Sequence, residues 1–176
     1  MRQVDPALVH RLFYPGVPAI LSARSGRTVA AMPVISYAQL SEKPPLFGVS
    51  CARRSFTLKL AASSKAFALS LLDAKHIRSV ELLASRRGKQ GSDKLAGAGL
   101  TSRKGRKVDA PVISESVAAL ECSVYSTETL GDHVLLVGKV EAAYASPDFR
   151  GYWRFIRYRP MLYAGWRDGM SSYKPS

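Results

Sequence analysis

The chain has 176 residues, of which 47% are hydrophobic and 22% are charged, and its formal net charge at pH 7 is +13. This composition excludes a disordered tail and a collagen-like chain, and no uncharged apolar run approaches the ~20 residues that a membrane-spanning helix needs. We therefore expect one soluble domain over residues 1–176, without internal repeats and without an interdomain linker.

The N-terminus combines an apolar stretch with residues that start helices. Residues 12–23 carry no charge and follow two arginines, which resembles a weak signal peptide, but prolines and a glycine interrupt them. Asp5 followed by Pro6 is typical of the cap and first turn of a short helix. We therefore expect a cytoplasmic protein that begins with such a helix.

The rest of the chain alternates short strands with a few short helices. Hydrophobic patterns predict strands at 19–23, 28–34, 46–51, 66–72, 117–127, 133–144 and 161–164. The patterns also predict helices at 55–60 and 76–85. The first two strands are expected to form one hairpin, and strands 117–127 and 133–144 another with a loop longer than two residues. In strand 117–127, Glu121 is expected on the polar face. This order favours an all-β or α+β barrel of antiparallel strands over a parallel sheet.

Much of the positive charge falls in one segment. Residues 86–107 carry eight Lys or Arg and one Asp, and their five glycines predict a solvated loop with at most one short helical turn. Such a loop can attract a polyanion or a phosphorylated small molecule, and a solvated loop without any ligand explains it more simply. Nucleic acid is not the expected ligand, because no aromatic residue interleaves with these charges.

Residues 50–57 offer the chemistry of an anion site. A predicted strand ends, arginines and hydroxyl groups follow, and a predicted helix begins; these polar residues are Ser50, Arg53, Arg54, Ser55 and Thr57. Backbone amides at a helix start favour an anion, and arginine can grip a phosphate through two parallel hydrogen bonds. The segment can therefore seat a monophosphate, although a helix cap with two solvated arginines fits the same residues.

Two further features bear on ligand binding. The small side chains in 30–36 would let a flat ligand approach the backbone, although a packed strand is the simpler interpretation. His133 begins a strand, where it could donate to a ligand or serve only a structural role. Cys51 and Cys122 are expected to be reduced core residues, since no metal-ligand spacing or disulfide framework is present. Because nucleophile motifs are also absent, reactivity would require a cofactor, with no metal expected.

Taken in order, these pieces resemble the flavin reductase-like FMN-binding proteins, which include flavoredoxin, small ferric reductases and reductase components of two-component monooxygenases. The matching segments are 18–21, 31–36, 44–50, 55–57, 67–72, 91–95, 120–122, 131–133 and 138–140. Each motif is short, but the ordered set is specific and covers about 18–144, with a weaker echo at 160–163. The aromatic and arginine-rich tail, 145–176, lies beyond it.

The resemblance implies a split β-barrel that forms a homodimer, with noncovalent FMN near the subunit interface. The residues that it places along the isoalloxazine ring and ribityl chain are Ala31, Met32, Pro33, Val34 and Ser36. Those that it places around the ribityl chain and phosphate are Ser50, Cys51, Ala52, Arg53, Arg54, Ser55 and Thr57. Ser92 and Lys94 match a Ser-Asp-Lys element that would complete the phosphate site. His133 matches a Gly-Asp-His element that would face the flavin or the nicotinamide.

The activity that the resemblance implies is hydride transfer from NADH or NADPH to FMN, with electrons then passing to a small-molecule acceptor or a partner oxygenase. A ferric reductase or a flavoredoxin-type electron carrier would use the same site. A noncatalytic module that binds FMN or nucleic acid is the alternative of a different class. The charge of 86–107 further predicts a preference for NADPH, because that cofactor carries an extra phosphate.

Overall fold

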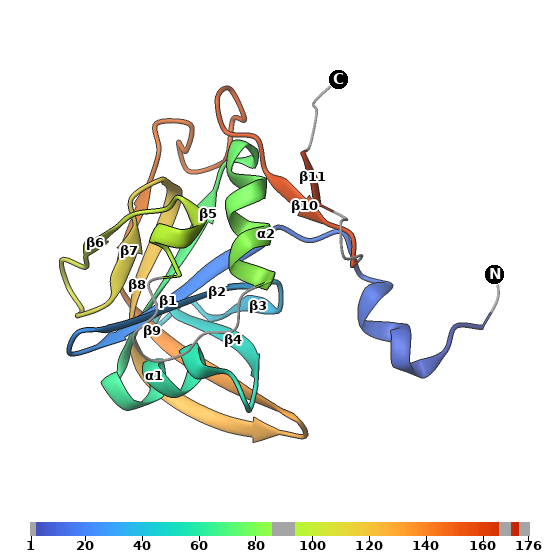
Figure 1. The fold of residues 1–176 in the computed structure, drawn as a ribbon, viewed down its shortest axis with the longest axis horizontal. Helices are drawn as coiled ribbons and strands as arrows, with labels where there is room; N and C mark the ends of the chain where they lie inside the picture. The colour runs from blue at the N-terminus through green and yellow to red at the C-terminus, as the bar shows by residue number, and fades with distance from the viewer. Residues whose placement is uncertain (1–2, 86–93, 166–169, 173–176) are drawn as a thin grey trace.

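The computed structural model describes residues 3–85, 94–165 and 170–172, and its main element is a seven-stranded antiparallel sheet (Figure 1). In spatial order its strands are β2 (Thr28–Val34), β1 (Ala19–Ser25), β5 (Ala66–Leu72), β8 (Ser116–Leu130), β9 (His133–Ala145), β4 (Leu46–Ala52) and β3 (Tyr37–Ser41). Two small pairs accompany it: β6 (Ser102–Lys104) with β7 (Pro111–Ile113), and β10 (Met161–Tyr163) with β11 (Met170–Ser172). The predicted antiparallel, mainly β architecture is confirmed.

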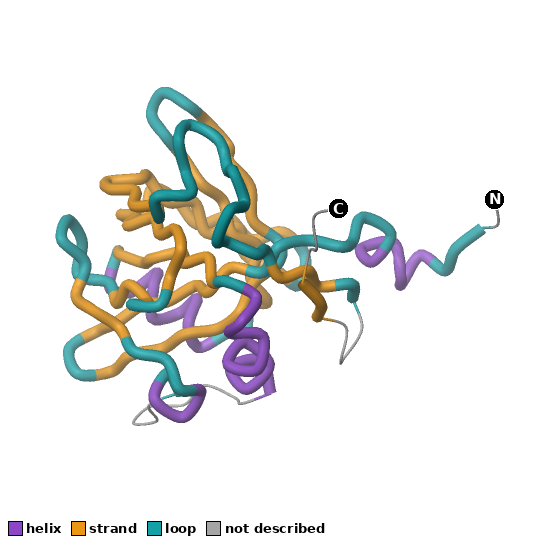
Figure 2. Tube along the Cα trace, turned by 90° about the horizontal axis from the view of Figure 1, so that it is seen from above, coloured by secondary structure: helices purple, strands orange, loops and turns teal. Residues whose placement is uncertain are grey.

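The helices are short and few among the described residues. They are η1 (Pro6–Arg11), α1 (Phe56–Ser64), η2 (Ala74–His76), α2 (Ile77–Ser85) and η3 (Ala96–Ala98). The predicted N-terminal helix is confirmed as a 3₁₀ helix: Asp5 caps it by accepting the backbone N–H of Ala7 at 2.8 Å, and Pro6 opens it. Figure 2 shows this helix standing apart from the strands.

Strand β2 lies between two packed cores. Val34 belongs to a cluster that β1, β4, β5 and α1 share, with Met32 packed against it. Ala31 belongs to a second cluster that includes Val80 and Leu83 of α2. Alternate residues of a strand point to opposite faces, so β2 presents one face to each core. Its backbone edge away from β1 pairs with no strand in the described sheet, where β2 and β3 are the two ends.

The structure corrects the prediction for the β8–β9 hairpin. Leu130 pairs directly with His133, so the loop is the two residues Gly131 and Asp132 and not a longer one. Gly131 has φ +60°, a conformation that costs glycine little and that tight hairpin turns require.

Glu121 and the basic segment also differ from expectation. Glu121 was predicted on a polar face but is fully buried, because the alternation of β8 breaks at an irregularity after Glu121 and a loop covers the carboxylate. Of the basic segment, 86–93 lies outside the described residues. The rest is not wholly solvated: it forms η3 and β6, and buries Leu95 and Leu100. The expected short helical turn is confirmed as η3.

Candidate functional site

Three segments far apart in the sequence meet where β4 ends. Ala52 of β4 pairs with His133 at the start of β9, and the backbone N–H of Arg53 donates to the carbonyl of Asp132 at 3.1 Å. The β4–β9 pairing therefore brings the Gly-Asp-His turn beside the arginine segment. On the same side of the sheet, the backbone N–H of Ser50 donates to the carbonyl of Ser36 at 2.8 Å, which ties the chain after β2 to β4.

The next residues begin α1. Ser55 caps the helix, accepting the backbone N–H of Leu58 at 3.2 Å, and its hydroxyl donates to the sulfur of Met32 at 3.1 Å. The predicted cap is thus confirmed, and it fastens the helix start to β2. No acidic residue lies in the first turn of α1, so the partial positive charge of the helix end is not offset locally.

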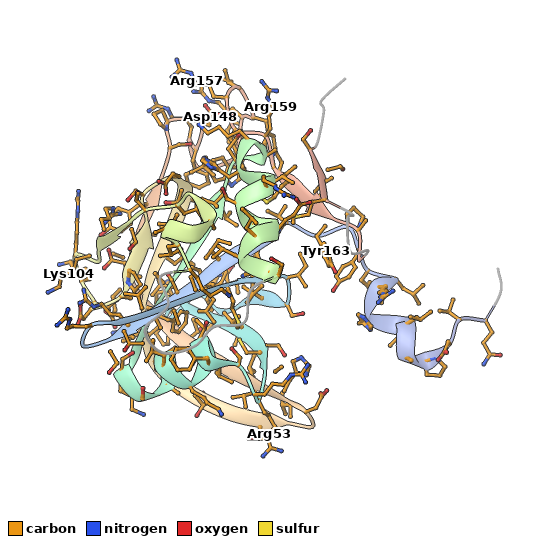
Figure 3. All side chains as sticks on the ribbon, viewed as in Figure 1. Arg53, Lys104, Asp148, Arg157, Arg159 and Tyr163 are labelled. Carbon is orange, nitrogen blue, oxygen red and sulfur yellow. The ribbon has the colours of Figure 1, made fainter. Side chains whose placement is uncertain are left out.

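Two arginines flank this helix start. Arg53 and Arg54 are exposed, and within the described parts of the chain neither side chain has an ion-pair or hydrogen-bond partner. Arg53 points outward at the edge of the molecule (Figure 3). Two unpaired guanidinium groups beside a helix N-terminus can receive an anionic group such as a phosphate.

A groove of about 830 Å³ follows the end of β2 on the side of α2. Pro33, Val34 and Ile35 form one wall, and residues of α2 including Arg78 and Glu81 form the other. Its remaining lining residues include Pro18, Tyr14, Tyr163 and Met170. This volume falls in the range of pockets that hold small ligands and cofactors. Sequence reasoning missed Tyr14, Arg78 and Glu81; the weak family echo at 160–163 is the signal that could have indicated Tyr163.

Several residues expected around the cofactor have buried side chains. Ala31, Val34, Cys51 and Thr57 are all less than a tenth exposed. Burial raises the pKa of the Cys51 thiol to about 12. These four residues can therefore meet a ligand through their backbone or by shaping the strand, whereas Met32, Pro33, Ser36, Ser50, Ala52 and Ser55 are at least partly exposed.

The predicted Ser-Asp-Lys element is only partly described. Ser92 lies outside the described residues, and Lys94 is 8% exposed. The Lys94 ammonium donates to the carbonyl of Leu83 at 2.9 Å, so it lies at the C-terminal end of α2. A lysine is favourable there because the last carbonyls of a helix lack partners and carry partial negative charge.

His133 is half-buried and held by its neighbour. Its Nδ1 lies 2.7 Å from a carboxylate oxygen of Asp132. The hydrogen bond from His133, together with its charge, lowers the pKa of the Asp132 carboxyl. This pair engages one ring nitrogen of His133, and the other has no hydrogen-bond partner among the described residues.

The described residues contain no group of three or more His, Cys, Asp or Glu arranged to hold a metal ion. In the same parts of the chain, no helix combines the length and the apolar character needed to cross a membrane.

Comparison with known proteins places these features in context. The chain matches the family described as flavin reductase like domain over residues 10–167. It is 32% identical over 166 residues to an uncharacterized protein of Aeropyrum pernix, covering 94% of this chain but only 63% of that longer relative. It is 25% identical over 182 residues to HsaB, the reductase subunit of a flavin-dependent monooxygenase from Mycobacterium tuberculosis, covering 97% of this chain and 93% of HsaB. The crystal structure of an FMN-binding protein from Thermus thermophilus with bound 1-cyclohex-2-enone superposes with a TM-score of 0.81 at 26% identity, covering 99% of this chain and 98% of that one.

Proposed function

Because the chain belongs to the flavin reductase-like family, we propose that it is an FMN-dependent oxidoreductase that takes a hydride from NADH or NADPH and passes electrons to a further acceptor. The family assignment confirms the resemblance found in the sequence and supports flavin reduction in general. FMN as the particular flavin, the nicotinamide donor and the acceptor are the proposed parts.

The observation that carries the proposal is the convergence of unpaired cations, hydroxyl groups and a free strand edge at one place. Arg53 and Arg54 flank a helix start without acidic neighbours, Ser36 and Ser50 lie alongside, and β2 leaves one backbone edge unpaired. FMN consists of a phosphate, a polyol chain and a flat apolar ring system, which call for these three kinds of partner in this order. The residues present therefore fit FMN.

Each part of the site has a separate task. The two arginines and the start of α1 would neutralise the phosphate, and the hydroxyls would hold the ribityl chain. The free edge of β2 can hydrogen-bond the polar rim of the ring, and the groove beside Pro33 and Ile35 shields it from water. When bound, FMN supplies the hydride-accepting chemistry. The Asp132–His133 pair would position the nicotinamide against the ring, since proximity and orientation are the main contribution left to the protein.

The proposed assembly is a homodimer with the flavin near its interface, in the cytoplasm. An unpaired β2 edge and large exposed apolar side chains support association, because such surfaces are usually covered in folded proteins. A partner oxygenase is proposed as one acceptor, supported by the relation to HsaB. A ferric chelate or a partner of an electron carrier would be an alternative acceptor at the same site.

The predicted preference for NADPH depends on the basic residues of 86–107 reaching the nicotinamide site. Arg103 and Arg106 lie against Tyr144, with guanidinium carbons 5.0 and 5.5 Å from the ring centre. Tyr144 and His133 are at opposite ends of β9, and at about 3.3 Å per residue an extended strand separates them by roughly 36 Å. Within one chain, Arg103 and Arg106 are therefore too far from His133 to bind the extra phosphate, so we propose that the same arginines of a partner subunit bind it.

The experiment that tests the proposal compares charge-matched variants. We expect the double variant Arg53→Gln/Arg54→Gln to weaken FMN binding by at least about 100-fold, since each of the two hydrogen bonds between charged groups contributes about 1.5–3 kcal/mol and 1.4 kcal/mol is a factor of ten. Riboflavin, which lacks the phosphate, should bind both proteins equally. The control Lys43→Gln/Lys59→Gln removes the same charge from exposed positions and should retain wild-type affinity.

Binding is measured by quenching of FMN fluorescence, and NADH or NADPH oxidation is followed with free FMN, ferric chelates and oxygen as acceptors. A protein that binds no flavin would refute the proposal. Tight FMN binding without oxidation of NADH or NADPH would refute the oxidoreductase and favour the alternative, a noncatalytic FMN-binding module. Equal loss of FMN and riboflavin in the arginine variant would refute the phosphate assignment.

A further inference from the structure

The N-terminal arm, residues 3–14, projects from the barrel in both views (Figures 1 and 2). No residue of η1 is buried. Its large apolar side chains are strongly exposed: 41% for Leu8, 50% for Val9, 57% for Leu12 and 90% for Phe13. Several large exposed apolar side chains on one short segment usually mark an interaction site.

The arm has a defined shape and a fixed root. The Asp5 cap and the backbone hydrogen bond from Leu12 to Val9 at 3.1 Å specify its helix. At the root, Gly16 and Tyr163 exchange backbone hydrogen bonds of 3.1 and 2.9 Å, and the rings of Tyr14 and Tyr163 pack at 5.3 Å. A six-residue 3₁₀ helix is marginal in water by itself, so a structure this exposed calls for a covering surface.

An apolar hollow elsewhere in the same chain is also uncovered. It has a volume of about 500 Å³ and is lined by residues of β1, β5, β8 and β9. Its wall includes Leu71 and Leu120 from the sheet, the exposed Ala143 of β9, and the aromatic rings of Phe149 and Trp153. Phe149 remains 43% exposed.

We propose that the arm of each copy docks into the apolar hollow of a second copy of this chain. This inference rests on the dimer in the proposed function and adds which surfaces form it. In a two-fold dimer each copy supplies one arm and one hollow, so a single symmetric contact covers both. A different partner would have to cover the arm and the hollow separately.

The exposed area agrees with this occupant. Given their exposed fractions, the four apolar side chains of the arm offer roughly 400–450 Å² per copy, taking about 150–210 Å² for a fully exposed side chain. Two arms and the surfaces that receive them would bury about 1,700 Å², close to the ~1,600 Å² of a standard stable interface. The arm alone therefore presents enough surface for a specific dimer.

Docking of the arm would also act on the flavin groove. Tyr14, at the root of the arm, lines that groove together with Pro33 and Ile35. Docking of the arm on a second copy would hold Tyr14, and with it this wall of the groove, in place. We therefore expect flavin retention to increase with dimer formation.

Sedimentation equilibrium tests the arm with variants matched in exposure. Leu12→Asp and Phe13→Asp should each raise the dimer dissociation constant at least tenfold. Tyr125→Asp is the control, because Tyr125 is 62% exposed against 57% for Leu12 and lies in β8 outside the arm, the hollow and the proposed flavin site. Its dimer dissociation constant should change less than threefold.

Cross-linking between two differently labelled chains tests the hollow. Cys51 and Cys122 are buried with pKa values of about 12, so single introduced cysteines would be the reactive thiols. A mixture of Phe13→Cys and Ala143→Cys chains should yield a mixed cross-linked dimer with a short bismaleimide. A mixture of Phe13→Cys with Lys104→Cys, an exposed position on β6, should not.

A dimer unaffected by both arm variants would overturn the proposal, as would a monomer whose Phe13 instead mediates binding to anionic phospholipid vesicles. Dissociation without the 13–143 cross-link would overturn the choice of the hollow. Flavin content measured in the same samples separates the two proposals. A colourless dimer that depends on Phe13 refutes only the flavin assignment, and a yellow dimer indifferent to Phe13 refutes only the arm.

Discussion

Replacing Glu121 by Gln tests how a buried carboxylate holds a loop onto the sheet. Glu121 of β8 is fully buried. Its Oε1 accepts the backbone N–H of Arg106 at 2.9 Å, and its Oε2 accepts those of Lys107 at 2.7 Å and Val108 at 3.2 Å. Burial would raise the pKa of this carboxyl, but the three backbone hydrogen bonds outweigh it and hold the pKa below its ordinary value.

The amide of glutamine would present an NH₂ group to at least one of these N–H donors. We expect Glu121→Gln to lower the free energy of unfolding by about 3–5 kcal/mol, the range for breaking a buried, hydrogen-bonded charge. Because domains of this size have about 5–15 kcal/mol in total, the variant should still fold. Urea unfolding measures the loss, and Glu128→Gln, an exposed position on the same strand, should change it by less than about 0.5 kcal/mol.

The dependence of the free energy of unfolding on pH gives an independent check on the direction of the Glu121 pKa shift. The folded-state pKa of Glu121 lies below its unfolded value, so its stabilisation is present above the unfolded pKa and is lost as the pH falls through the folded one. The wild type should therefore lose more stability than Glu121→Gln below about pH 4.3, the ordinary pKa of glutamate. Equal stability of the two proteins at pH 7, or parallel pH profiles, would refute the reasoning.

Three further outcomes follow from packing and burial. Gly138→Ala would drive a Cβ into the ring of Phe67, so urea unfolding should show a loss of about 1–3 kcal/mol. Cys51 and Cys122, each with a pKa raised by burial to about 12, should resist iodoacetamide at pH 8 and both react in urea, as counted by mass spectrometry. The Asp148 carboxylate accepts two backbone N–H groups nine and ten residues further on, which lower its pKa; Asp148→Asn should speed amide exchange in 146–160 without altering the exchange of β5.

Strands whose formation depends mainly on their own residues were predicted correctly from the sequence. Strands 28–34 and 66–72 appear with the predicted bounds. The first consists largely of small and β-branched residues and the second is a continuous apolar run, and both compositions favour a strand. Strand β3 was missed: it is a short edge strand with an exposed Ala38 and Gln39, and within the described sheet it pairs with β4 alone. Strand pairing of this kind depends on a distant segment, which a sequence window does not contain.

The same limit applies to the site. The helix cap at Ser55 and the position of the turn before His133 were predictable from neighbouring residues, whereas the two-residue length of that turn was not. Their meeting was available only through the family resemblance, because it depends on the β4–β9 register that pairs Ala52 with His133. The burial of individual side chains was not predictable from the sequence either. Cys51 lies on the inner face of β4, and only the packed core shows that its thiol is not exposed to a ligand.

If the phosphate binds at Arg53 and Arg54 as proposed, charge density along the chain is a poor guide to the anion site. The basic residues of the described part of 86–107 include Arg103 and Arg106, which stack on Tyr144, and Arg103 lies 4.0 Å from the buried Glu121. Their field is partly neutralised by the fold itself. Arg53 and Arg54 contribute only two charges, but they stand beside a helix start without acidic residues, where each hydrogen bond to a phosphate is new. On the proposed function, a phosphate gains more from two unpartnered cations at a helix start than from arginines that already contact Tyr144 and lie near Glu121.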